Sequence, residues 1–260
     1  MAPPPNRFGH VLITGASSGL GAALARECAA PDVVLHLSGR EAGRLEAVAQ
    51  ACREAGARVL PRVLDVRDAA AMATWIGDAG RLDLVIANAG IGAGTGDATE
   101  DAEAARAVFE TNVTGVLNTA LPAIAAMARQ TPGPDGWRGH VAVIASIAAF
   151  VAGPSAPAYC ASKSAVQRWA EARDATERRR GIRLHAICPG FVRTPMTAKN
   201  AFPMPWIMTP EEAARRTLLG ISRGRLRVAY PRRLYALARI IGALPPEWRA
   251  RLMAQAPPKA

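Results

Sequence analysis

Short apolar runs alternate along the chain with longer stretches whose apolar residues recur at helical spacing. Buried strands are predicted at His10–Thr14, Val33–Leu37, Arg58–Leu64, Leu84–Ala87, Val141–Ala145, Ile182–Ile187 and Arg225–Ala229. Helices are predicted at about 19–30, Glu41–Ala55, from Asp68, Glu100–Gln130 and about 158–179. Strands that alternate with helices over short links form βαβ units. The pattern therefore predicts one doubly wound α/β domain of the Rossmann type, whose parallel sheet is covered on both faces.

Composition and charge agree with a single folded domain. Of the 260 residues, 50% are hydrophobic and 20% are charged, so the chain can bury enough apolar surface to offset the entropy lost on folding. The 32 basic and 21 acidic residues give a net charge of +11. Residues 1–130 carry −3 and residues 131–260 carry +14, so the positive charge belongs to the later part of the chain.

The cysteines and the apolar runs indicate a cytoplasmic protein. Cys28, Cys52, Cys160 and Cys188 form no CxxC pair, and neither they nor the scattered histidines have metal-ligand spacing. We therefore expect reduced thiols, structural histidines and no metal. The first residues lack the apolar stretch of a signal peptide, and the apolar run at 141–152 is too short to span a bilayer.

A glycine-rich turn follows the first predicted strand and precedes the first predicted helix. It reads Thr14-Gly15-Ala16-Ser17-Ser18-Gly19-Leu20-Gly21. In a dinucleotide-binding loop the first glycine permits the tight turn, the second lets the backbone approach a pyrophosphate, and the third allows close helix–strand packing. The helix N-terminus then offers unpaired N–H groups to phosphate.

A second motif lies at the start of the helix predicted near 158–179. Tyr159 and Lys163 are four residues apart, so the phenol and the ammonium share one helix face. A nearby cation favours the phenolate, which lets a tyrosine exchange a proton with an alcohol or a ketone at neutral pH.

These motifs occur together with Asn88-Ala89-Gly90, Asn112, Ser146 and Pro189-Gly190, each near the end of a predicted strand or inside a helix. In this order and spacing they resemble the short-chain dehydrogenase/reductase family, and the resemblance covers about residues 8–195. It implies a seven-stranded parallel sheet in the order 3-2-1-4-5-6-7. Ala87 and Ala145 depart from the family's usual Asn and Ser, but neither departure removes a reacting group.

The resemblance also implies the catalytic set. Tyr159 is the acid/base, and Lys163 lowers its pKa and binds the nicotinamide ribose. Ser146 bonds to the substrate oxygen, and Asn112 holds a water that links Lys163 to solvent. The activity implied is hydride transfer between a nicotinamide and a carbonyl or alcohol carbon. The alternative is a catalytically silent nucleotide-binding or membrane-surface scaffold of the same fold.

The family likeness assigns the cofactor-binding residues as well. Asp65 and Val66 would meet the adenine, although Asp65 could merely cap the following turn. Asn88 and Gly90 would shape the cleft beside the adenosine ribose. The other cofactor-binding residues are those of the phosphate loop and of the nicotinamide end, namely Gly15, Ser17, Ser18, Gly19, Leu20, Gly21, Pro189, Gly190, Val192 and Thr194.

NADP(H) is predicted over NAD(H). An enzyme of this fold that uses NAD(H) places Asp or Glu near the end of the second strand to bind the ribose 2′-hydroxyl. Here that stretch reads His36-Leu37-Ser38-Gly39-Arg40, with no acid before Glu41. Arg40 can pair with a 2′-phosphate and Ser38 can add a hydroxyl. NAD(H) remains the alternative, since Arg40 could instead cap the helix or pair with an acid.

The segment at about 191–209 is expected to form the substrate lid of a catalytic domain that spans residues 1–230. Its three Met, one Phe and one Trp suggest an adaptable apolar pocket for a hydrophobic ketone or secondary alcohol. These residues could alternatively only pack the lid onto the core. We also expect a homo-oligomer, either a dimer or a tetramer.

Residues 231–260 are expected to form a basic, amphipathic helical extension. Leu234, Leu237, Ala238 and Ile241 share one helix face, and arginines flank it. The extension could pack on the pocket or a subunit interface, or lie on an anionic membrane at the inner surface. Nucleic-acid binding is not expected, because no groove-reading motif or interleaved stacking aromatics occur.

Overall fold

The computed structural model describes residues 8–94, 99–198, 200 and 202–254. Three parts of the sequence predictions therefore fall outside the described residues. They are residues 1–7, which were searched for a signal peptide, Lys199 and Ala201 of the expected lid, and residues 255–260 of the expected extension.

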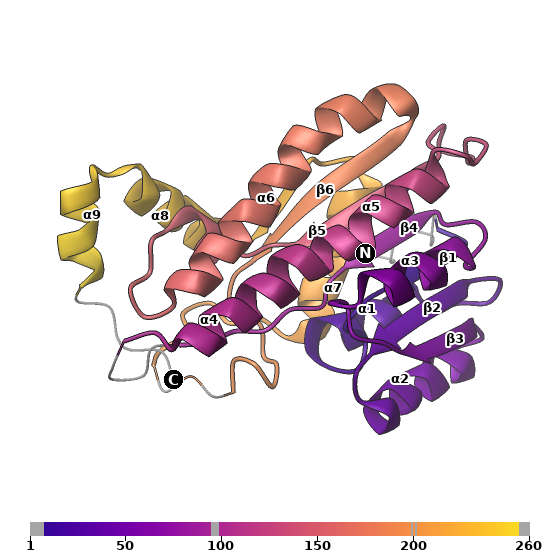
Figure 1. The fold of residues 1–260 in the computed structure, drawn as a ribbon, viewed down its shortest axis with the longest axis horizontal. Helices are drawn as coiled ribbons and strands as arrows, with labels where there is room; N and C mark the ends of the chain where they lie inside the picture. The colour runs from indigo at the N-terminus through magenta and orange to yellow at the C-terminus, as the bar shows by residue number, and fades with distance from the viewer. Residues whose placement is uncertain (1–7, 95–98, 199, 201, 255–260) are drawn as a thin grey trace.

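Seven parallel strands form one sheet in the order β3-β2-β1-β4-β5-β6-β7 (Figure 1). This confirms the predicted Rossmann architecture. The connection from β3 to β4 crosses from one half of the sheet to the other, which makes β1 and β4 neighbours in space. The strands are β1 His10–Ile13, β2 Val34–Gly39, β3 Arg58–Val63, β4 Leu84–Ala87, β5 Gly139–Ile144, β6 Ile182–Pro189 and β7 Arg227–Tyr230.

Helices cover both faces of the sheet, because the central strands are apolar on both sides. On one face α1 (Gly19–Cys28), α2 (Ala42–Glu54) and α7 (Pro210–Ser222) pack over a core that includes Leu24, Leu45 and Ile221. On the other face lie α3 (Ala69–Gly77), α5 (Gly115–Met127) and α6 (Pro157–Glu177).

The stretch predicted as one helix over Glu100–Gln130 is helical but interrupted. It consists of α4 (Ala102–Phe109), a π-helical turn over Glu110–Thr114, and α5. The π turn contains Asn112, which is fully buried and bonds to groups outside its own helix. Such turns are frequent at functional sites because they redirect a side chain without ending the helix.

Two helices follow β7 beyond the edge of the sheet. These are α8 (Arg232–Ala243) and α9 (Pro246–Met253), which form the left-hand end of the molecule in Figure 1. The inner face of α8 packs on the short 3-10 helix Ile147–Phe150, where the rings of Phe150 and Tyr235 meet edge to face. Among the described residues, no helix is long and apolar enough to cross a membrane.

Candidate active site

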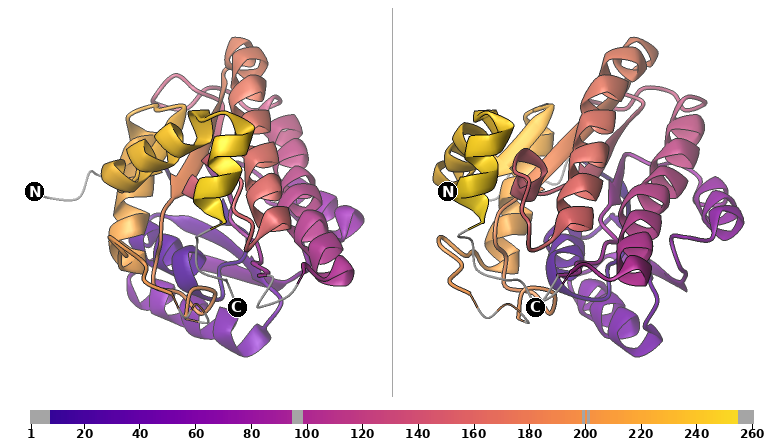
Figure 2. Two further views of the ribbon diagram at one scale, coloured as in Figure 1. Left: turned by 90° about the vertical axis from the view of Figure 1, so that its left-hand side faces the viewer. Right: turned by 60° about the vertical axis from the view of Figure 1, so that its left-hand side comes forward.

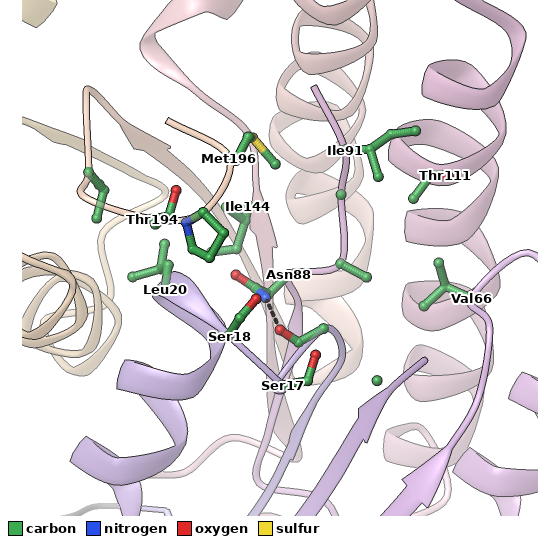
Figure 3. A pocket seen from close by; sticks show the side chains of 18 of the residues that line it. Ser17, Ser18, Leu20, Val66, Asn88, Ile91, Thr111, Ile144, Thr194 and Met196 are labelled. Carbon is green, nitrogen blue, oxygen red and sulfur yellow. Dashed lines mark hydrogen bonds between the residues drawn. The ribbon is translucent and has the colours of Figure 1, made fainter. Parts of the chain in front are cut away.

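A cleft of about 300 Å³ lies at the carboxyl ends of the strands, where the order of the sheet reverses at β1 and β4. This is where open α/β sheets bind ligands. In Figure 3, Ser17 and Ser18 lie beside Asn88, with Thr194 and Met196 on one side and Val66 and Thr111 on the other. The cleft brings together nearly all predicted site residues: Gly15, Ser17, Ser18, Gly19, Leu20, Gly21, Arg40, Asp65, Val66, Asn88, Gly90, Ser146, Tyr159, Lys163, Pro189, Gly190, Val192 and Thr194.

The glycine-rich turn between β1 and α1 can be built only with glycine at two positions. Gly15 has φ +65°, and a Cβ there would lie 2.7 Å from the Cα of Ala89. A Cβ on Gly21 would lie 2.2 Å from the carbonyl oxygen of Gly15. Ser18 precedes α1 but its side chain does not cap the helix, so the first N–H groups of α1 face the cleft uncapped. This arrangement fits a dinucleotide pyrophosphate.

Asn88 holds this turn in place from the end of β4. Its Nδ2 donates to the carbonyls of Thr14 and Gly15, at 2.9 and 3.1 Å. In return, Thr14 Oγ1 accepts from the backbone N–H groups of Asn88 and Ala89. The side chain of Asn88 therefore shapes the cleft by ordering the glycine-rich turn.

Tyr159, Ser146 and Lys163 meet at the inner end of the cleft. Ser146 bonds to the Tyr159 phenol, which opposes the larger effect of burial on that group; burial raises the pKa of Tyr159. Lys163 Nζ donates a 2.8 Å hydrogen bond to the carbonyl of Ile144 and lies 5.8 Å from the centroid of the Tyr159 ring. Burial lowers the pKa of Lys163 to about 8. The site thus holds a protonated phenol beside an amine that releases its proton unusually easily.

Asn112 does not line the cleft. It lies fully buried behind the lining residues. Its Oδ1 accepts from the Ile91 N–H, and its Nδ2 donates to the Ile91 carbonyl and to Ser162 Oγ. Ser162 in turn donates to the carbonyl of Tyr159. Asn112 therefore ties the π turn to the loop after β4 and to the helix that carries Tyr159.

The end of the cleft beside β2 is basic. Arg40 is exposed and makes no hydrogen bond or ion pair with the residues that the structure describes. Glu41 pairs with Arg44 at 3.2 Å, one turn into α2. Ser38, which was predicted to offer a hydroxyl here, does not line the cleft. It is fully buried inside β2, opposite Arg62 of β3.

Asp65 lines the cleft after β3, where the charge of Arg40 acts on its carboxylate, and this carboxylate is already engaged. Its two oxygens accept from the backbone N–H of Arg67 and, in a forked pair, from the Arg67 guanidinium. The bonds from Arg67 lower the pKa of Asp65, so the group is a carboxylate at neutral pH. The structure places Asp65 at the predicted position and adds Arg67 as its partner.

The segment expected to form the lid begins after β6 and is held by local hydrogen bonds. Thr197 Oγ1 donates to the carbonyl of Val192, and the Thr194 N–H donates to Thr197 Oγ1. Met196 lines the cleft and is 37% exposed, whereas Trp206 is 47% exposed and does not line it.

Several lining residues were not predicted as site residues. Glu41 directly precedes α2 and Arg44 lies in its first turn, and these opposite charges three residues apart after Arg40 could have revealed them. Thr111 adjoins the predicted Asn112, and Thr197 lies in the segment predicted as the lid, whereas Ile91 carries no recognisable pattern in the sequence. Within the described part of the chain, no group of three or more His, Cys, Asp or Glu side chains could hold a metal ion.

The chain is similar to proteins of known family. A family model described as short chain dehydrogenase matches residues 9–203. An uncharacterized oxidoreductase from Myxococcus xanthus is 37% identical over 238 residues, which cover 90% of this chain and 92% of that relative.

Two solved structures show the same fold with a cofactor bound. A short-chain dehydrogenase from Sphingobium yanoikuyae in complex with NADPH is 26% identical, with a TM-score of 0.77 over 95% of this chain and 96% of its own. A short chain dehydrogenase from Mycobacterium paratuberculosis bound to NAD is 25% identical, with a TM-score of 0.73 over 86% of this chain and 97% of its own.

Proposed function

Because the chain belongs to the short-chain dehydrogenase/reductase family, we propose that it interconverts a hydrophobic ketone and the corresponding secondary alcohol with NADP(H). The observation that carries this proposal is the meeting of Tyr159, Ser146 and Lys163 at the inner end of the cleft. The family makes the protein an oxidoreductase that uses a nicotinamide dinucleotide; the substrate class, the preference for NADP(H) and the roles of these residues are the proposal.

Three groups of residues in the cleft would contact three parts of a bound cofactor. The glycine-rich turn and the N-terminus of α1 would hold the pyrophosphate. Asp65 and Val66 would flank the adenine, and Pro189, Gly190, Val192 and Thr194 the nicotinamide. The bound cofactor supplies or accepts a hydride at the substrate carbon.

The protein supplies the proton. Since burial raises the pKa of Tyr159, its phenol carries a proton at neutral pH and can donate it to a carbonyl oxygen while the carbon gains hydride. Ser146 would bond to the same oxygen. The phenolate left on Tyr159 then regains a proton from the Lys163 ammonium, which exchanges with solvent. In the oxidation of an alcohol each of these proton transfers runs in reverse.

The preference for NADP(H) rests on the basic end of the cleft. A 2′-phosphate beside β2 would meet the guanidinium of Arg40, which makes no hydrogen bond or ion pair with the described residues. The acids beside it are engaged: Glu41 is paired with Arg44, and Asp65, on which the charge of Arg40 acts, is paired with Arg67. Each therefore repels that phosphate less than a lone carboxylate would. Both features favour the phosphorylated cofactor over NAD(H).

The substrate end of the cleft supports a hydrophobic carbonyl compound. Ile91, Ile144 and Met196 line it, and Trp206 lies exposed on the lid. Thioether and aromatic side chains adapt to apolar molecules of varied shape. We further propose that the enzyme is a cytoplasmic homo-oligomer, a dimer or a tetramer.

Replacing the Tyr159 phenol tests the mechanism directly. Tyr159→Phe should abolish turnover of carbonyl compounds with NADPH while leaving the dissociation constant of NADPH within about threefold, because only the proton-transfer group is removed. Tyr230→Phe is the matched control, since that phenol bonds to Thr217 away from the cleft. Turnover by Tyr159→Phe at the wild-type rate would refute the mechanism. Binding of NADPH by the wild-type protein without turnover of any carbonyl compound would favour the catalytically silent nucleotide-binding scaffold.

A further inference from the structure

The outer surface of the two C-terminal helices is apolar and basic together. Four large side chains point outward from α8 and α9: Leu237 is 46% exposed, Ile240 66%, Trp248 66% and Leu252 48%. Together they form the most exposed group of large apolar side chains on neighbouring elements among the described residues. We call this group, with the arginines around it, the C-terminal surface.

The inner face of α8 is packed against the core. The outer face is therefore exposed although the helix is firmly docked. Ala238 is buried, and a Cβ on Gly242 would lie 1.9 Å from the carbonyl oxygen of Phe150. Tyr235 Oη accepts from Arg227 and Arg239, and Arg227 is paired with Glu171 of α6. These contacts fix α8 to the core with one side packed and the other facing away, as the left panel of Figure 2 shows.

The charge of the C-terminal surface indicates what covers it. The helices contain Arg232, Arg233, Arg239, Arg249 and Arg251 against one acid, Glu247, which gives a net charge of +4. A symmetric contact between two copies of this surface would bring +4 against +4, and the apolar gain would be opposed by repulsion. An anionic surface instead attracts the arginines and accepts the apolar side chains between them.

We propose that the C-terminal surface binds the surface of an anionic lipid bilayer, with Trp248, Leu252, Leu237 and Ile240 inserted among the acyl chains and the arginines at the headgroups. The bound state is peripheral and reversible, since the helices are short and their charge contribution is screened by salt. This proposal goes beyond the proposed reaction and needs no turnover to be tested.

The orientation on the membrane follows from the inner contacts of α8. Leu234 of α8 lies against Gly190, which lines the nicotinamide end of the cleft, since a Cβ on Gly190 would lie 2.8 Å from Leu234 Cδ2. The helix that binds lipid is thus also part of the cleft's surroundings. A membrane-bound enzyme would hold this end of the cleft near the bilayer, where an apolar carbonyl compound concentrates.

Co-sedimentation with vesicles tests the proposal on the full chain. The protein should pellet with vesicles of phosphatidylglycerol and phosphatidylcholine at low salt, and should be released by high salt or by vesicles of phosphatidylcholine alone. Arg232→Gln/Arg233→Gln/Arg251→Gln should weaken the partition coefficient by roughly two orders of magnitude, because each basic residue near such a surface contributes about fivefold. Trp248→Ser/Leu252→Ser should weaken it by roughly tenfold or more.

Matched control variants distinguish binding through the C-terminal surface from binding that depends only on the total charge or on the total exposed apolar area. Arg106→Gln/Arg179→Gln/Arg215→Gln removes the same charge from exposed arginines elsewhere and should bind nearly as wild type. Leu60→Ser/Leu121→Ser removes exposed apolar side chains elsewhere and should also bind as wild type. The proposal is overturned by failure to pellet with anionic vesicles at low salt, or by equal losses in the test and control variants. It is also overturned if Trp248→Ser/Leu252→Ser dissociates an oligomer in sedimentation velocity without changing vesicle binding.

Discussion

His140 Nδ1 lies 3.0 Å from His185 Nε2, so two buried imidazoles join β5 to β6 at the end of the sheet away from the cleft. His185 Nδ1 lies 2.7 Å from the carbonyl oxygen of Arg225. A carbonyl only accepts, so Nδ1 of His185 carries the proton and its Nε2 accepts from His140. His140 Nε2 lies 2.8 Å from Asp135 Oδ2, which also only accepts, so His140 donates from both nitrogens only when it is protonated beside that carboxylate. Burial lowers the pKa of His185 to about 3, so His185 is the neutral partner of the two.

This arrangement makes folding sensitive to acid. Below about pH 6.5 the unfolded chain protonates His185, whereas the folded chain does so only near its pKa of about 3. The free energy of unfolding should therefore fall as the pH decreases through this window, by about 1.4 kcal/mol per pH unit from this residue. Urea unfolding between roughly pH 5.5 and 4 measures the slope, which His185→Gln should reduce by that amount. Equal slopes in the two proteins would contradict the assignment.

Gly90 separates two groups of the active site, and an added methyl group should push them apart. A Cβ at this position would lie 3.0 Å from Asn112 Oδ1 and 3.3 Å from Lys163 Nζ. Gly90→Ala should lower kcat by roughly ten- to hundredfold, because displacement of a catalytic group by less than about 1 Å has effects of this size. Steady-state kinetics with NADPH measure it. Gly77→Ala is the matched control, since nothing lies within 4 Å of a Cβ there, and it should keep wild-type kcat.

Much of the fold could be predicted because its strands are continuous apolar runs between helical periodicities. Leu84–Ala87 was predicted to the residue, and six other strands were placed within a few residues. The π turn over Glu110–Thr114 could not be predicted from periodicity. It depends on hydrogen bonds between Asn112, Ile91 and Ser162, which are distant in the sequence and become neighbours only in the folded chain.

The cleft residues that belong to a sequence motif could be predicted. A residue whose position in the cleft depends on where a strand ends could not. The second strand was expected to end at Leu37, which would leave Ser38 in a loop able to meet a cofactor. It continues to Gly39 instead, so the Ser38 side chain is buried within the sheet. The contact between His140 and His185 was also missed, because it depends on the register of β5 with β6 rather than on sequence spacing.

The buried ammonium of Lys163 should lower the free energy of unfolding of the protein. Burial lowers the pKa of Lys163 from 10.5 to about 8. At neutral pH the ammonium is therefore less stable in the folded chain than in the unfolded chain, which lowers the free energy of unfolding. Lys163→Met should therefore raise the free energy of unfolding at pH 7 by about 1–3 kcal/mol, less whatever the hydrogen bond to Ile144 contributes. It should also lower kcat by at least about a hundredfold. Urea unfolding and turnover assays measure both effects, and a destabilised variant that still turns over would contradict the role of the ammonium.

Arg40 should decide between the two cofactors. Its guanidinium is exposed at the end of β2 and makes no hydrogen bond or ion pair within the described chain, so it can pair with a 2′-phosphate. Arg40→Gln should raise the dissociation constant of NADPH by roughly ten- to hundredfold and change that of NADH by less than about threefold, because only NADPH carries the phosphate. Calorimetric titration measures both constants. Arg58→Gln is the matched control, since Arg58 is exposed at the start of β3, away from the cleft. It should change neither dissociation constant. An equal loss of affinity for both cofactors would show that Arg40 contacts a part of the cofactor that they share, and would remove the basis for the NADP(H) preference.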